Sequence, residues 1–261
     1  MKYFSCDNRT TVRMPAALAA LALFFVMTGP AYAQLQGLYP DFFQIERPGQ
    51  LSATLFGGGF ISDRYGVTDE GFQLEQSFTR YISPFARATG YQLYLKNNNV
   101  SPFNPSSGRH SPRLNFGRFQ GGLDFALYPG TDLYVSGGGD AGDAHGGLVE
   151  GDFSSWLMPH ARHPLNASFS SIHTFQNGVT SSEIDLELML LSTENWMVLG
   201  GAGGAIYGGG FIRGSATGQG GPDLGVFYRP WQMGANLQFG YGAAAHNFGQ
   251  LNLYKQLTFT E

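Results

Sequence analysis

Charged residues are scarce in this sequence. They make up 13% of its 261 residues, whereas they supply about 25% of a typical soluble domain. A surface with so little charge is poorly suited to keeping neighbouring molecules apart in water. Acidic side chains outnumber basic ones, 19 against 15, and the sequence contains no basic run. This balance argues against a nucleic-acid partner.

Long apolar runs are missing after the N-terminal segment. Because a membrane-spanning helix needs about 20 consecutive apolar residues, the rest of the chain is expected to contain none. The start of the chain has the parts of a secretory signal: three basic side chains, a short apolar segment at 15–27, and small residues in Ala31-Tyr32-Ala33. We predict a cleaved signal peptide over residues 1–33. An uncleaved anchor helix is the alternative, but no basic or stop-transfer flank follows the segment.

Cysteine is nearly absent, since Cys6 is the only one in the chain. Because Cys6 lies in the predicted signal peptide, the mature chain is expected to have no disulfide, no thiol and no cysteine-ligated metal. No cysteine sits near the expected cleavage site, which argues against a lipoprotein. The histidines match no metal-binding spacing. We therefore predict no metal and no cofactor.

Aromatic residues and glycines are abundant instead, with 15% aromatics and 38 glycines. Apolar side chains also alternate with polar or small ones, most clearly over 231–242. The apolar positions of that segment are Trp231, Met233, Ala235, Leu237, Phe239 and Tyr241. This period of two is typical of a strand with one apolar face. A run of about ten residues is long enough for a tilted strand to cross a membrane.

The same alternation recurs along the chain and predicts about twelve strands, although ten would also fit the pattern. The predicted spans are 51–62, 70–81, 84–96, 114–128, 131–140, 146–157, 164–174, 182–192, 195–206, 222–229, 231–242 and 248–259. Residues 34–50 are rich in turn-forming residues. They are expected to form a periplasmic lead-in or a small plug.

The predicted connections alternate in length along the chain. Tight connections are expected at 82–83, 129–130, 159–163, 193–194 and 230. Longer connections are expected at 63–69, 97–113, 141–145, 175–181, 208–221 and 243–247. Outer-membrane barrels place short turns in the periplasm and longer loops outside. We therefore predict an all-β fold: a transmembrane antiparallel up-and-down β-barrel with both termini in the periplasm.

Residues 51–261 resemble bacterial outer-membrane β-barrel proteins as a class. The resemblance rests on the alternation, the connections and a final strand in which Leu251, Leu253 and Phe259 share an apolar face. It implies location in the cell outer membrane, contact with outer-membrane lipid, and recognition of the C-terminal strand by the barrel assembly machinery. Lys255 falls on the same apolar face, so a bulge or snorkelling is expected there. The soluble alternative is a secreted β-sandwich, such as a carbohydrate-binding module.

The predicted register turns eight charged side chains toward the barrel interior. They are Glu75, Arg118, Asp124, Glu150, Asp152, Asp185, Glu187 and Arg229. Six acids against two bases favour a small passive or weakly selective pore for cations or small polar solutes. A closed structural or adhesive barrel, with a salt-bridged interior and binding through its external loops, fits the same pattern. The predicted loop 97–113 fits either a constriction or a recognition surface.

A lipid-modifying hydrolase is a further alternative. The stretch from His173 to Gly178 is loosely similar to the His-x-Ser-Asn-Gly motif of outer-membrane phospholipase A and the related lipid A deacylases. In this sequence Phe175 occupies the place of the serine, so the nucleophile of that family is missing. We therefore predict that the protein is not an enzyme.

Overall fold

Twelve strands account for most of the residues that the computed structural model describes, which are 48–63, 65–95, 113–128, 131–157, 161–175, 180–208, 217–243 and 246–259. The strands are β1 (Leu51–Ser62), β2 (Tyr65–Gln76), β3 (Ile82–Leu95), β4 (Arg113–Tyr128), β5 (Thr131–Gly142), β6 (Gly146–Leu157), β7 (Leu165–Thr174), β8 (Thr180–Ser192), β9 (Trp196–Gly208), β10 (Thr217–Tyr228), β11 (Met233–Gly242) and β12 (His246–Phe259). The predicted signal peptide and most of the predicted lead-in lie outside the described residues.

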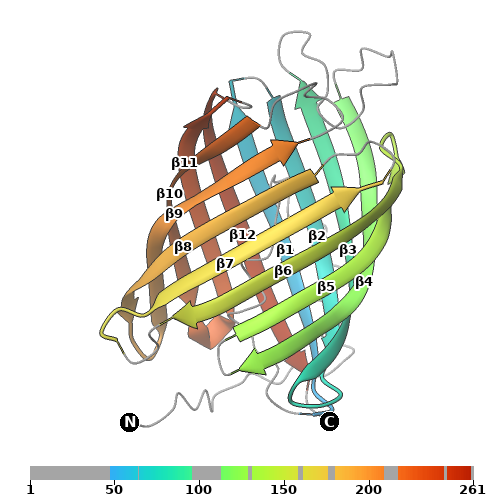
Figure 1. The fold of residues 1–261 in the computed structure, drawn as a ribbon. Coiled ribbons are helices and arrows are strands. Elements are labelled where there is room, and N and C mark those ends of the chain that lie inside the picture. Colours follow the sequence, from blue (N-terminus) through green and yellow to red (C-terminus); the bar gives the residue numbers. More distant parts are fainter. Residues whose placement is uncertain are drawn as a thin grey trace.

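The strands form one closed antiparallel barrel (Figure 1). Each strand lies beside its neighbours in the sequence, and β12 pairs with β1 in a ladder that runs from Leu51–Phe259 to Ser62–Phe248. The strands β1 and β2 lie at the two ends of the sheet order and are joined by a tight turn in which the Ser62 hydroxyl donates to the Tyr65 carbonyl at 2.8 Å. The predicted up-and-down barrel is confirmed, with twelve strands rather than ten.

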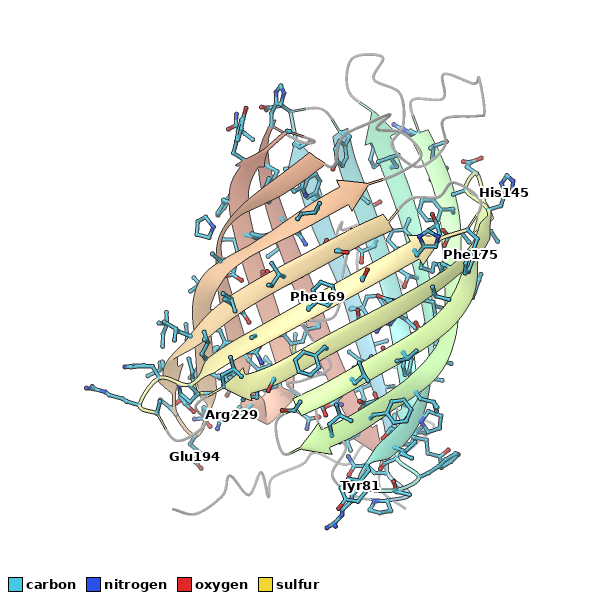
Figure 2. The ribbon with its side chains drawn as sticks, viewed as in Figure 1. Tyr81, His145, Phe169, Phe175, Glu194 and Arg229 are labelled. Carbon is cyan, nitrogen blue, oxygen red and sulfur yellow. The ribbon has the colours of Figure 1, made fainter. Side chains whose placement is uncertain are left out.

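The barrel has two ends. The terminal end is where β1 begins and β12 ends, and the loop end is the opposite one, where β3 and β9 end and β4 and β10 begin. Figure 2 shows Glu194 and Arg229 at the terminal end and His145 at the loop end. Nearly all of the predicted loop 97–113 lies outside the described residues, because only Arg113, the first residue of β4, is described.

The prediction for β2 was wrong by five residues at each end. The strand begins at Tyr65 because Val67 and Asp69 are buried on its inner face. It ends at Gln76 because Thr79 closes a turn, in which its hydroxyl oxygen accepts from the backbone N–H groups of Tyr81 and Ile82. The connection between β1 and β2 is therefore tight, and the predicted alternation of short and long connections holds only in part.

The prediction for β10 began five residues too late. Glycines at 218, 220 and 221 hide the alternation there, yet the ladder with β9 is continuous from Thr217–Tyr207 to Tyr228–Trp196. The last strand is regular as well. Lys255 pairs with Leu55 on one side and Met233 on the other, without a shift of register. The predicted bulge at Lys255 is therefore absent. The other predicted alternative stays open, in which the half-buried side chain snorkels toward the terminal end.

The outer face of the barrel is apolar over most of its surface. Phe169 and Phe175 point away from the wall in Figure 2, and along β8 the side chains of Ile184, Leu186 and Leu188 are exposed. Outward apolar side chains on every second residue are what a barrel wall in contact with acyl chains requires.

Within the described residues, no helix is long and apolar enough to cross a membrane.

Glycines make room for large side chains inside the barrel. Gly234 on β11 faces Tyr254 on β12, and a Cβ atom added to Gly234 would lie 2.0 Å from the tyrosine ring. We expect Gly234→Val to destabilise the barrel by about 1–3 kcal/mol, the usual cost of overpacking. Urea unfolding, followed by the loss of heat-modifiable gel migration, measures the effect.

The matched control is Gly121→Val on the outward face of β4, where an added Cβ has no neighbour closer than 3.9 Å. A Gly234→Val barrel as stable as this control would contradict the packing described for Tyr254.

Candidate functional site

The inner face of the barrel is the candidate functional site, because polar side chains are turned inward from most strands. On β8 the alternation is complete: Asp185 and Glu187 are buried, whereas Ile184, Leu186 and Leu188 between and beside them are exposed. The ladders carry this inner face across the sheet, since Asp185 pairs with Ser168 on β7 and with Gly203 on β9.

The structure places seven of the eight predicted interior residues at buried, inward positions of strands. They are Glu75, Arg118, Asp124, Glu150, Asp152, Asp185 and Glu187. The eighth, Arg229, lies outside the wall. It begins a 3-10 turn from Arg229 to Trp231 at the terminal end, and its guanidinium donates to the Ser192 hydroxyl at 2.9 Å. The strand stops before this turn because Pro230 has no N–H to donate to a ladder.

Six further charged side chains face the interior, and sequence reasoning missed them. They are Asp69, Arg87, Asp132, Asp140, Glu183 and Asp223. The signal for two of them was present: Glu183 shares the parity of Asp185 and Glu187, and Asp223 lies on the inward parity of its predicted strand. Asp69 was not predicted to face the interior because the predicted strand began at residue 70, whereas β2 begins at Tyr65.

The interior is therefore strongly acidic. Among the described strand residues, eleven carboxylates and two guanidinium groups face inward. The carboxylates are Asp69, Glu75, Asp124, Asp132, Asp140, Glu150, Asp152, Glu183, Asp185, Glu187 and Asp223, and the guanidinium groups are Arg87 and Arg118. Since each arginine can balance one carboxylate, most of the negative charge needs another partner.

Arg87 is the centre of one polar network. Its Nη1 lies 3.5 Å from Glu150 Oε2 across the interior, and both side chains are largely buried. Its Nε donates to Gln73 Oε1 at 2.9 Å, and Gln73 in turn donates to Glu75 at 3.1 Å. The amide of Gln120 also donates to Glu150. The network links β2, β3, β4 and β6, so it fixes the position of these carboxylates.

Arg118 forms a second, more local pair. Its Nε and Nη2 donate to the two oxygens of Asp140 at 2.8 and 3.0 Å, the bidentate geometry that favours arginine with a carboxylate. The guanidinium also lies over the Tyr91 ring, 5.3 Å from its centroid. This cation is therefore held against the wall of β3, β4 and β5.

Two apolar clusters occupy other parts of the interior. Near the terminal end, one cluster consists of Phe56, Met197, Leu199, Phe227 and Tyr254, with Trp156 and Met189 packed against it. Near the loop end, the second consists of Phe60, Val67, Leu93, Leu114 and Phe248. The first lies mainly on the side of β8 to β12 and the second on the side of β1 to β4. Both clusters narrow the lumen through which a solute could pass.

The carboxylates are distributed along the barrel. At the terminal end are Glu75, Asp124 and Asp132, near the ends of β2 and β4 and the start of β5. Glu75 interacts electrostatically with Asp132 and with Arg87. Because Arg87 also pairs with Glu150, the terminal-end acids are connected to those in the middle of the barrel.

The series continues on the opposite wall. Glu183 interacts electrostatically with Glu150 and Asp152 on β6 and with Asp185 on its own strand. Asp185 interacts with Asp223 on β10. Glu183 lies near the start of β8, at the loop end. We call the eleven inward acids the acidic track; its members occur at both ends of the barrel and in its middle.

The stretch that is loosely similar to the hydrolase motif, which begins at His173, lies elsewhere. Ser171 and His173 share the outward parity of Phe169 on β7, and the Ser171 hydroxyl is 3.0 Å from the Ser182 hydroxyl. Asn177 lies outside the described residues. Within the part of the chain that the structure describes, no group of three or more histidine, cysteine or acidic side chains has a geometry that could hold a metal ion.

Comparison with known proteins yields matches by structure only. No protein-family model and no curated protein matches the chain. An outer membrane channel from Pseudomonas putida has a TM-score of 0.52 at 11% identity, over 83% of this chain and 98% of that one. LpxR from Salmonella typhimurium has a TM-score of 0.50 at 7% identity, over 81% and 100%.

The β domain of the Bordetella autotransporter BrkA is similar to the same extent, with a TM-score of 0.50 at 11% identity over 82% of this chain and 100% of that one. The three proteins have different names, and each resembles this chain in its barrel fold. At such low identity the likeness concerns the fold alone. The chain has the closed antiparallel fold of outer-membrane β-barrel proteins.

Proposed function

We propose that the protein is an outer-membrane barrel that forms a narrow, cation-preferring pore. The observation that carries the proposal is the acidic track, in which eleven inward carboxylates face only two inward guanidinium groups among the described residues. Carboxylates along a pore raise the local concentration of cations and exclude anions. Mobile cations also supply the positive charge that the two arginines do not.

The surface of the barrel supports a location in the outer membrane. Exposed apolar side chains on alternate residues suit a lipid bilayer, and aromatic side chains such as Trp196, Trp231 and Tyr81 at the terminal end suit its interface. We propose a cleaved signal peptide over 1–33 and insertion by the barrel assembly machinery through β12, whose outward face includes Leu251 and Leu253. The terminal end then faces the periplasm.

The pore is proposed to be small. Inward side chains such as Glu150, Asp152 and Ser154 are almost fully buried, so side chains occupy much of the interior and leave little free width for a solute. The apolar clusters around Phe227 and Phe248 narrow it further. Small cations and small polar solutes fit such an interior, and the proposed transport requires no catalysis.

Neutralising two acids in the middle of the track tests the proposal. In Asp185→Asn/Glu187→Gln the side-chain volumes are kept while two negative charges are lost. We expect the permeability ratio of K⁺ over Cl⁻ to fall several-fold, because the field along the pore weakens. The reversal potential across a planar bilayer in a KCl gradient measures this ratio.

The control is Glu194→Gln, in the exposed turn between β8 and β9 at the terminal end. This change removes a charge outside the track and is expected to leave the ratio nearly unchanged. An equal effect of both variants, or no effect of either, would speak against conduction along the track.

A closed barrel is the second candidate function, and the two apolar clusters favour it. In that case the buried network around Arg87 would be a structural interior and the protein would act through its external loops. The two candidates differ in conductance: a barrel that is folded, shown by heat-modifiable migration, yet gives no current steps would be closed.

A further inference from the structure

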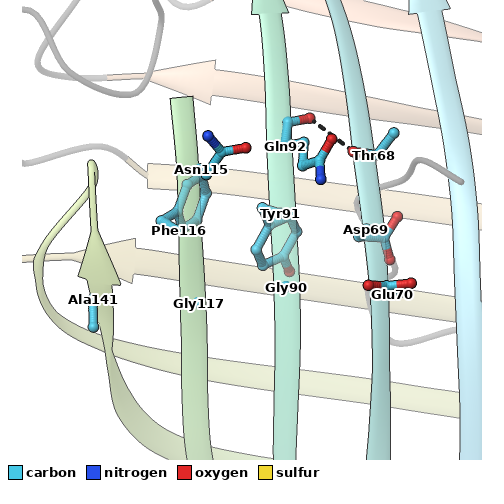
Figure 3. A pocket seen from close by; sticks show the side chains of 10 residues that line it. All are labelled: Thr68, Asp69, Glu70, Gly90, Tyr91, Gln92, Asn115, Phe116, Gly117 and Ala141. Carbon is cyan, nitrogen blue, oxygen red and sulfur yellow. Dashed lines mark hydrogen bonds between the residues drawn. The ribbon is translucent and has the colours of Figure 1, made fainter. Parts of the chain in front are cut away.

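The apolar outer face is interrupted by polar and small residues on β2 to β5 near the loop end. A groove of about 480 Å³ lies there (Figure 3). The row Glu70, Gly90, Gly117 and Ala141 crosses the four strands in register, and all four residues are on the outward face. Toward the loop end, Thr68, Gln92 and Asn115 form the next row.

No large apolar side chain projects into the groove from these outward positions. Elsewhere on the outer face near the loop end, Ile61, Val149, Ile206 and Tyr241 are strongly exposed. The groove instead has a carboxylate, two amides and a glycine floor. The Tyr94 hydroxyl donates to Gln92 Oε1 at 2.6 Å. Because polar groups that face acyl chains without a hydrogen-bond partner cost free energy, a polar occupant that pairs with the Glu70 carboxylate and the amide N–H groups would stabilise the groove.

The floor is shaped by two glycines. A Cβ atom at Gly90 would have no neighbour closer than 3.8 Å, and at Gly117 none closer than 3.4 Å. The nearest atoms are the Glu70 backbone oxygen at Gly90 and the Phe119 ring at Gly117, so without Cβ atoms the backbone stays accessible to a flat, ring-shaped group that would stack beside Phe119. Glu70, Gln92 and Asn115 are exposed around it, and together they offer hydrogen-bond donors and acceptors of the kind that hydroxyl and amide groups of sugars require.

A positively charged side chain, that of Arg113, lies at the edge of the groove nearest the loop end. Arg113 is two residues before Asn115 on the same outward face of β4 and is exposed. Its guanidinium lies 5.4 Å from the centre of the Tyr94 ring, which holds it close to the wall. The Arg113 guanidinium would attract a phosphate attached to a sugar in the groove.

We propose that the groove binds the saccharide headgroup of an outer-leaflet glycolipid. The acyl chains would lie on the apolar wall toward the middle of the membrane, with Phe119 next to Gly117, and the sugar would fill the space over Gly90 and Gly117. The proposal rests on the orientation given under the proposed function, with the loop end outside. It does not depend on whether the barrel conducts ions.

The test fills the groove without disturbing the wall. Gly90→Leu places an apolar side chain over the floor, and Asn115→Leu removes one amide. The matched control is Gly137→Leu, an exposed outward glycine of β5 outside the groove, where an added Cβ has no neighbour closer than 3.8 Å. Each variant, extracted from the outer membrane in detergent, is first checked for heat-modifiable migration.

Rough-type lipopolysaccharide is the probe, and phosphatidylglycerol is the comparison lipid. Native mass spectrometry measures the fraction of barrels that carry each lipid during a titration. We expect Asn115→Leu to weaken retention of the lipopolysaccharide about tenfold, the loss expected for one strong hydrogen bond, and Gly90→Leu to weaken it at least as much, because the leucine side chain occupies the space of the sugar. Gly137→Leu should bind it like the parent, and phosphatidylglycerol should be retained equally by all.

Three results would overturn the proposal. Equal lipopolysaccharide retention in all folded variants would show that the groove is not its site. Loss of phosphatidylglycerol alone in Gly90→Leu would assign the groove to a phospholipid. A parent that is a dimer and a Gly90→Leu variant that is a monomer, with unchanged lipid retention, would assign it to a second copy of the chain.

Discussion

Replacing Phe227 and Tyr254 together with alanine is expected to raise the single-channel conductance several-fold. The two rings stack in the terminal-end cluster, with centroids 6.2 Å apart and planes within 7°. Both are almost fully buried inside the barrel. The Tyr254 ring fills the space above Gly234. Truncation of Tyr254 and Phe227 therefore leaves an opening that water and ions can fill. A wider lumen conducts better.

Planar-bilayer recording of single steps measures this change. The control is Phe239→Ala/Leu251→Ala, which removes two large side chains from the outward face and is expected to leave the step size unaltered. If the interior variant folds and its steps equal those of the parent, the terminal-end cluster does not limit conduction.

The second large effect concerns stability. Arg87→Met is expected to lower the free energy of unfolding by about 3–5 kcal/mol, because removal of one partner leaves Glu150 as an uncompensated buried charge. Arg87 also donates to Gln73, so the loss reaches the hydrogen bond between Gln73 and Glu75. Urea unfolding in detergent micelles, monitored by tryptophan fluorescence, measures the difference.

Two comparisons isolate the ion pair. Arg80→Met removes an exposed arginine that lies 4.5 Å from the Tyr81 ring centroid in a turn, and it should change stability little. Adding Glu150→Gln to Arg87→Met should restore much of the lost stability, because the buried charge is then gone. A loss for Arg80→Met as large as that for Arg87→Met would show that the network around Arg87 has no special role.

The alternation of side chains was sufficient to predict the barrel wall where each strand has one apolar and one polar face. On β8, Asp185 and Glu187 alternate with large apolar residues, and both the strand and the inward direction of its acids follow from this pattern. The pattern fails where both faces carry small residues. Thr217 to Gly221 of β10 is such a segment, and its place in the sheet is known from the pairing with β9 and β11.

The interior contacts could not be predicted in the same way. Arg87 and Glu150 are 63 positions apart, and the curvature of the sheet from β3 to β6 brings their side chains together. The terminal-end cluster likewise joins Phe56 on the first strand to Tyr254 on the last. The outer groove has the same origin, since Glu70, Gln92 and Asn115 come from three strands and share a face only through the register.

The most direct test of the account is the reversal potential of the unmodified barrel, extracted from the outer membrane and inserted into a planar bilayer under a KCl gradient. The acidic track predicts small discrete current steps and a reversal potential displaced toward the potassium equilibrium potential. A folded, heat-modifiable barrel that gives no steps, or whose reversal potential is displaced toward the chloride equilibrium potential, would contradict it.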